Sequence, residues 1–62
     1  MKYRQIEALL RKNGWVWVRT NGSHRIFKHP VNPETIAVPF HGSSKELGTP
    51  VTMDILKKAG LR

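Results

Sequence analysis

Three consecutive residues, Gly22, Ser23 and His24, stand where a turn leads into the start of an expected β-strand. Histidine is the side chain that takes or gives a proton near neutral pH without special arrangement. Glycine lets a phosphate backbone approach closely, and successive N–H groups in such a turn can form a nest for an anion. These residue types at this spacing therefore point to proton transfer beside a phosphate.

The expected strand pairing adds a cation to this histidine. If Asn21 and Gly22 form a two-residue hairpin, Arg19 lies directly opposite His24, and the two share one face of the sheet. A guanidinium there can hold a phosphate through two parallel hydrogen bonds while the imidazole accepts a proton. A one-residue bulge would break this pairing. A histidine that opens a strand is also often an exposed residue with no catalytic role.

The composition indicates an anionic partner. The 62 residues include eleven Lys and Arg against four Asp and Glu, which gives a formal net charge of +7. Such an excess attracts nucleic acid, an anionic membrane or an acidic protein. Because the cations are spread over every expected element, we favour nucleic acid over a membrane surface. A basic surface that only keeps the protein in solution is the alternative.

Length and residue content bound the architecture. We expect one domain over residues 1–62, without disulfides because the chain has no cysteine. The longest apolar run covers residues 15–18 and is too short to span a membrane. No export signal is recognisable at the start, so the expected location is the cytoplasm.

Periodicity and turn residues predict the element order α-β-β-β-α. A helix over residues 2–13 is followed by strands over 15–19, 24–29 and 35–38 and by a helix with Thr49 as its N-cap. Gly14 and Gly60 are placed to end the two helices in a left-handed conformation. We expect a three-stranded antiparallel sheet with both helices on one face, an α+β fold. Trp15 is expected in the core, and the face that Trp17 occupies is left open.

Motifs along nearly the whole chain, from residue 2 to residue 61, resemble the HicA toxin family. They comprise Gly14-Trp15 after a Leu-Leu helix, Arg19, Gly22-Ser23-His24, Phe27, Val38-Pro39-Phe40-His41, Gly48-Thr49-Pro50 and the ending Ile55-Leu56-Lys57-Lys58-Ala59-Gly60-Leu61. The chain departs from many members at Tyr3, where they carry a Ser or Asp helix cap. The resemblance implies a fold like that of double-stranded-RNA-binding domains, cleavage of mRNA without the ribosome, and inhibition by a HicB antitoxin. The family's catalytic histidine corresponds to His24.

A metal-independent endoribonuclease mechanism is consistent with these residues. RNA carries its own nucleophile, the 2′-OH, and His24 would act on it as general base. Developing charge on the phosphate would be stabilised by Arg19, Arg25 or Lys28. The proton for the leaving oxygen would come from water, from His24 or from His41.

The remaining candidates are contacts to substrate phosphate. His41 and Lys45 lie in an irregular segment after the third strand, and Lys45 precedes the N-terminus of the second helix. His29 precedes Pro30 at a strand end and is expected to be merely exposed. The spacing of the three histidines fits no zinc site, so we expect no metal and no cofactor. The expected partners are single-stranded mRNA and the antitoxin; a non-catalytic RNA-binding module is the alternative function.

Overall fold

The computed structural model describes all residues from 1 to 62 and has the predicted order of elements. These are helix α1 (Tyr3–Lys12), strands β1 (Val16–Asn21), β2 (His24–Lys28) and β3 (Thr35–Pro39), and helix α2 (Thr49–Lys58). The strands form one antiparallel sheet in the order β1-β2-β3. The expected α+β fold is confirmed. Neither helix has the length and apolar character needed to cross a lipid bilayer.

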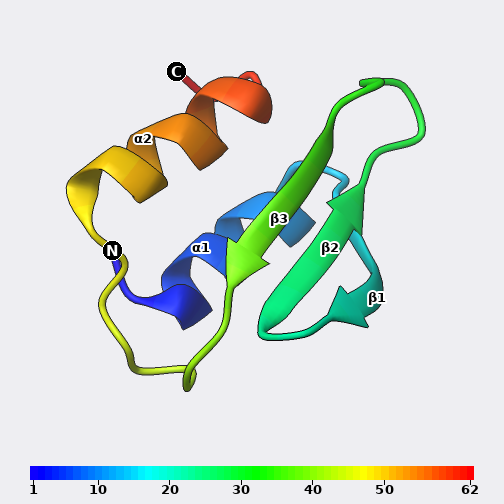
Figure 1. The fold of residues 1–62 in the computed structure, drawn as a ribbon. Helices are drawn as coiled ribbons and strands as arrows, with labels where there is room; N and C mark the ends of the chain where they lie inside the picture. Colours follow the sequence, from blue (N-terminus) through cyan, green and yellow to red (C-terminus); the bar gives the residue numbers. More distant parts are fainter.

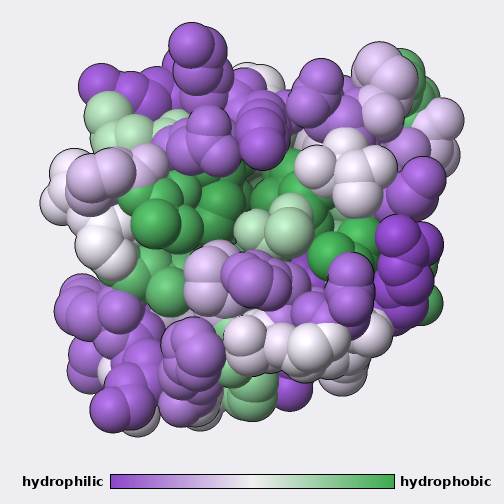
Figure 2. Space-filling view, in the orientation of Figure 1, coloured by the Kyte–Doolittle hydropathy of each residue, from purple (hydrophilic) through white to green (hydrophobic).

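The two helices cover one face of the sheet, and the other face is open (Figure 1). Strand residues that face the helices are the apolar ones at every second position of β3, Ile36 and Val38, together with Phe27 of β2. They join one buried cluster with residues of both helices and of the segments next to them, the members being Tyr3, Ile6, Leu10, Trp15, Leu47, Ile55 and Ala59. Seen from the β3 edge, apolar residues gather between α2 and β3 inside a polar rim (Figure 2).

Both helices end in the same hydrogen-bonded motif. Gly14 has φ +90°, and the N–H groups of Gly14 and Trp15 donate to the carbonyls of Arg11 and Leu10. Gly60 has φ +74°, and the corresponding bonds from Gly60 and Leu61 reach Lys57 and Leu56. These are Schellman motifs, in which glycine adopts the left-handed conformation without steric cost. The predicted helix ends are therefore confirmed.

The start of α2 differs by one residue from the prediction. Thr49 is the first helical residue rather than the cap, and Gly48 takes the N-cap position. The carbonyl of Gly48 accepts the hydrogen bond from the N–H of Thr52. Because Gly48 offers no side-chain oxygen, the first turn has no side-chain cap. Pro50 still falls in the first turn, where its missing N–H costs nothing.

The hairpin between β1 and β2 is built differently from the expected one. Its two central residues are Gly22 and Ser23, not Asn21 and Gly22. Gly22 has φ +62° and no non-glycine residue has a positive φ, which is the pattern of a type II′ turn with glycine first. Asn21 therefore remains in the strand and pairs with His24.

A bulge in β1 shifts the pairing again. Trp17 lies opposite Phe27, whereas Arg19 lies opposite Ile26, so Val18 is the extra residue between them. The expected Asn21-Gly22 hairpin without a bulge would instead set Trp17 opposite Ile26, so the bulge overturns that register. Because opposed residues share a face, Trp17 lies on the helix face with Phe27. The sequence had left the face of Trp17 open, and the register assigns Trp17 to the helix face.

Candidate active site on the open face of the sheet

His24 is the first residue of β2 and is exposed to solvent. Asn21 pairs with it on one side and Pro39 on the other, so it stands in the last row of the sheet at the end that holds the hairpin turn. The N–H of Phe40 donates to the carbonyl of Ser23 at 2.7 Å and continues the pairing beyond that row. The backbone on both sides of His24 is therefore held by hydrogen bonds while its ring is accessible.

The prediction that Arg19 lies directly opposite His24 is wrong, but the two share a face. Arg19 pairs with Ile26, two residues from His24, and side chains two residues apart in a strand lie on the same side. Arg19 is thus the diagonal neighbour of His24, a position that ordinarily separates Cα atoms by about 7–8 Å. Both residues are exposed. A cation and an imidazole therefore flank the same open surface.

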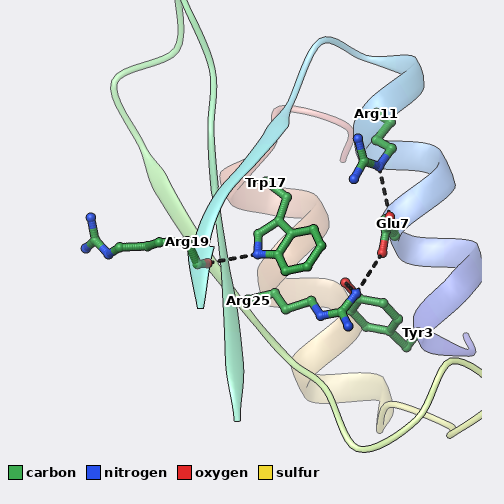
Figure 3. Close-up of polar contacts among 6 residues, drawn as sticks. All are labelled: Tyr3, Glu7, Arg11, Trp17, Arg19 and Arg25. Carbon is green, nitrogen blue, oxygen red and sulfur yellow. Dashed lines mark hydrogen bonds and ion pairs between the residues drawn. The ribbon is translucent and has the colours of Figure 1, made fainter. Parts of the chain in front are cut away.

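A hydrogen bond across the bulge holds the backbone of Arg19. The indole Nε1 of Trp17 donates a hydrogen bond of 2.9 Å to the carbonyl oxygen of Arg19 (Figure 3). The indole ring lies on the α1 side of the sheet, whereas the Arg19 side chain extends away from it (Figure 3). One side chain of β1 thereby braces the backbone that presents the next cation to the other face.

Arg25 lies on the helix face, not beside His24. Its guanidinium carbon is 3.6 Å from the ring centroid of Phe40 and 4.3 Å from that of Trp17. Its Nη1 lies 3.4 Å from the hydroxyl of Tyr3 and 3.6 Å from Oε1 of Glu7. Successive strand residues point to opposite faces, which is why the neighbour of an exposed histidine is enclosed by aromatic rings.

Lys28 lies on the open face at the far end of β2. It pairs with Val16 and Thr35, two rows beyond Ile26 in the direction away from the turn. Its side chain is exposed. The open face therefore carries His24, Arg19 and Lys28 in a diagonal series, with the histidine at the turn.

The segment after β3 returns to the same end of the sheet. His41 follows Phe40, whose backbone is tied to Ser23, and both His41 and Lys45 are exposed. The carbonyls of Ser43 and Lys45 accept hydrogen bonds of 2.9 Å from the first N–H groups of α1. These carbonyls occupy the N-terminus of α1, so the segment is fixed to α1.

The chain matches the family model described as the HicA toxin of bacterial toxin-antitoxin over residues 3–61. The match covers almost every residue of the chain. The chain belongs to the HicA toxin family. No curated protein matches it significantly. Membership implies that this HicA family toxin has a cognate antitoxin.

On the helix face of this HicA family toxin, one acidic residue, Glu7, contacts two arginines and a tyrosine. Glu7 accepts a hydrogen bond of 2.8 Å from Arg11 Nε and faces Arg25 (Figure 3). Partial burial favours a higher Glu7 pKa, but hydrogen bonds from Tyr3 and Arg11 and the charges of Arg11 and Arg25 together lower the pKa. Burial raises the pKa of Tyr3 to about 12, and the hydrogen bond to Glu7 adds to the increase.

His29 is a structural residue, contrary to the expectation that it is merely exposed. Its Nδ1 accepts hydrogen bonds from the N–H groups of Val31 and Asn32, at 3.0 and 3.1 Å. Nε2 lies 3.0 Å from the carbonyl oxygen of Asn13, which can only accept, so the proton of the ring is on Nε2. The ring also packs on Trp15, with centroids 5.1 Å apart.

Sequence reasoning missed the residues around Arg25 and the contacts of His29. The Glu7–Arg11 pair was visible as an i,i+4 pair, but its extension to Arg25 joins positions 18 residues apart. Phe40 lay within a family motif without an assigned role. No three of the His, Asp and Glu side chains are grouped as metal ligands would be.

Proposed function

We propose that this HicA family toxin is an endoribonuclease that cleaves mRNA without a metal ion and uses His24 as general base. The observation that carries the proposal is the position of His24. Its ring is exposed in the row next to the turn, its backbone is held on both sides, and Arg19 shares its face. Proton transfer needs a group that can reach its substrate and that is held in place, and His24 meets both conditions.

The proposed reaction uses the nucleophile that RNA itself supplies. His24 accepts the proton of a ribose 2′-OH, the oxygen attacks the adjacent phosphorus, and the bond to the 5′-oxygen of the next nucleotide breaks. The products are a 2′,3′-cyclic phosphate and a 5′-OH. The leaving oxygen takes its proton from the protonated His24, from His41 or from water. DNA lacks the 2′-OH and is not a substrate.

Cations of the open face stabilise the charge that develops on the phosphate. Arg19 is the nearest by the strand register, and Lys28 extends the basic surface along the RNA strand. A side chain added at Gly22 would meet no atom within 4 Å, so the surface above this turn is unobstructed. This supports Gly22 and Ser23 as the place where the RNA backbone approaches. His41 and Lys45 would contact neighbouring phosphates from the segment after β3.

The cognate antitoxin would inhibit the toxin by covering this surface. The net charge of +7 and the exposed cations around His24 favour an antitoxin with an acidic contact surface. The same surface would then serve RNA and antitoxin in turn. We place the reaction in the cytoplasm, where mRNA is found.

Cleavage of single-stranded RNA in the presence of EDTA tests the proposal. We expect cyclic-phosphate ends with the unaltered protein, none with His24→Ala, and products of full yield with His29→Gln measured at a temperature at which it is folded. Equal cleavage by His24→Ala and the unaltered protein would reject the role of His24. Salt-dependent RNA binding without products from any variant would indicate the non-catalytic RNA-binding module instead.

A further inference from the structure

A hollow of about 490 Å³ lies between α1, β2 and the segment after β3, on the helix side of the sheet. Three guanidinium groups line it, those of Arg4, Arg11 and Arg25. It also exposes the ring of Phe40 and the small side chain of Ala8. Nothing in the proposed reaction uses this hollow.

The hollow carries a net positive charge, and its one carboxylate pairs with two of its three arginines. Glu7 is its one carboxylate, and it holds Arg11 at 2.8 Å and Arg25 at 3.6 Å. Arg4 is exposed and forms no ion pair. Arg4 and Arg11 are seven residues apart on α1, or about 10 Å along the axis. Ala8 is on the same side of the helix between them, because it is four residues from one and three from the other.

Arg25, which lines the hollow, packs among aromatic rings. Its guanidinium carbon lies 3.6 Å from the ring centroid of Phe40, 4.3 Å from that of Trp17 and 5.4 Å from that of Tyr3. Figure 3 shows Arg25 beside Trp17 and Tyr3. The hydrogen bond and the ion pair of Arg25 both involve Nη1, which leaves Nε and Nη2 without a partner in the chain. These donors can reach the edge of a base, and the part of the Phe40 ring that lines the hollow offers that base an aromatic surface.

The hollow lies at the same end of the sheet as His24. Phe40 lines the hollow, and its N–H is bound to the carbonyl of Ser23, the residue before His24. An RNA strand that presents a 2′-OH to His24 on the open face can therefore continue around the end of the sheet toward Arg4.

We infer that this hollow binds a nucleotide of the RNA strand close to the cleaved linkage. Arg4 and Arg11 hold its phosphate groups, Ala8 leaves room for the sugar, and the base packs on the part of the Phe40 ring that lines the hollow, where Arg25 can donate to its edge. The inference rests on the proposed ribonuclease function. Cations beside an aromatic platform match a nucleotide, which combines negative charge with a planar ring, better than they match an acidic peptide.

RNA binding by the His24→Ala protein tests the inference without interference from cleavage. In that background we compare Arg4→Gln with Lys57→Gln, which removes the same charge from an exposed position of α2 outside the hollow. Loss of one phosphate contact should weaken binding about fivefold at 0.1 M salt and reduce the salt slope by about 0.7. Lys57→Gln should change affinity less than about twofold, because its charge is distant and screened.

A second pair of variants separates filling of the hollow from loss of charge. Ala8→Glu places a carboxylate between the two arginines, whereas Ala8→Gln adds nearly the same volume without charge. We expect Ala8→Glu to weaken RNA binding more than Arg4→Gln does, and Ala8→Gln to weaken it less than Ala8→Glu. Both residues favour helix, so the melting temperatures should match that of the parent protein.

The outcomes separate this inference from the proposed function. If the unaltered protein cleaves RNA but Arg4→Gln and Ala8→Glu bind it as the parent does, the hollow is not a nucleotide site and the function stands. If these variants lose RNA affinity while no protein cleaves, the hollow is an RNA site and the proposed reaction is wrong. If they lose only antitoxin affinity, the hollow belongs to the protein interface and the inference is overturned.

Discussion

The indole nitrogen of Trp17 is hydrogen-bonded across the β1 bulge to the carbonyl oxygen of Arg19, so one residue of the strand sets the position of another on the opposite face. The bond spans only two residues, yet it connects the aromatic stack around Arg25 with the open surface that carries His24. The position of Arg19 in the candidate site thus depends on how Trp17 packs on the α1 side of the sheet.

Replacement of Trp17 by Phe tests this coupling. The ring is kept and the donor is lost, so we expect the free energy of unfolding in urea to fall by about 1 kcal/mol. RNA cleavage should fall as well, because the Arg19 backbone loses its brace. Val16→Thr, at an exposed position of the same strand, is the control and should leave both measurements nearly unchanged. Full activity of the Phe variant would contradict the coupling.

Removal of the Arg19 charge should affect turnover more than removal of the Lys28 charge. Arg19 is the diagonal neighbour of His24, whereas Lys28 stands two rows farther along the open face. We expect Arg19→Gln to lower kcat by on the order of tenfold, the modest effect of a charge stabiliser in a solvated site. Lys28→Gln should mainly raise KM. The reverse ranking in steady-state cleavage of a short RNA would place the phosphate elsewhere.

Glu7 should make stability depend on acid. Its pKa is lowered in the folded protein, so its contribution is complete above the unfolded value of about 4.3 and is lost as pH falls through the lower folded value. Glu7→Gln should therefore be less stable than the unaltered protein at pH 7, by about 1 kcal/mol, and the difference should shrink below pH 4. Urea unfolding at pH 7, 4 and 2.5 measures it. A constant difference across this range would contradict the assignment.

Tyr3 is the only tyrosine, so its ionisation can be followed directly by phenolate absorbance. We expect a pKa of about 12 in the folded protein and about 10 in denaturant. A tyrosine whose pKa is raised by folding stabilises the protein below the unfolded value, and the protein loses this contribution as pH rises from 10 to 12. Titration of the folded protein near pH 10 would show that Tyr3 is not enclosed beside Glu7.

His29 should be important for stability and dispensable for chemistry. His29→Ala removes three hydrogen bonds and the contact with Trp15, so we expect a loss of about 2 kcal/mol in the free energy of unfolding. His41→Ala, at an exposed position, should leave stability unchanged. Cleavage by folded His29→Ala at low temperature should equal that of the unaltered protein, and a specific loss of kcat there would assign His29 to the reaction.

The sequence predicted the elements because their signals are local. Apolar spacing in the helices, and Gly14 and Gly60 beyond their ends, depend on neighbours within one or two turns. The hairpin was misplaced because Asn-Gly favours one turn type, whereas here Gly22 occupies the first central position of another. The bulge at Val18 could not be predicted, because valine is not a residue type that marks a bulge.

The rest of the site depends on contacts between distant residues. The Arg25 stack brings together β1, β2, α1 and the segment after β3, and no spacing rule connects those positions. His29 is held by backbone groups 2, 3 and 16 residues away, which sequence patterns do not reveal. His24 and Arg19 kept a common face only because the pairing moved by two residues instead of one.

The hydrogen bonds of His29 have a practical consequence for chemical modification. Both of its ring nitrogens are occupied by backbone partners, whereas His24 and His41 form no such bonds and are exposed. A reagent that acylates imidazole in the native protein should therefore label two rings quickly and the third only on unfolding. The number of fast-reacting groups then gives a direct count of the histidines that an RNA strand or an antitoxin can shield.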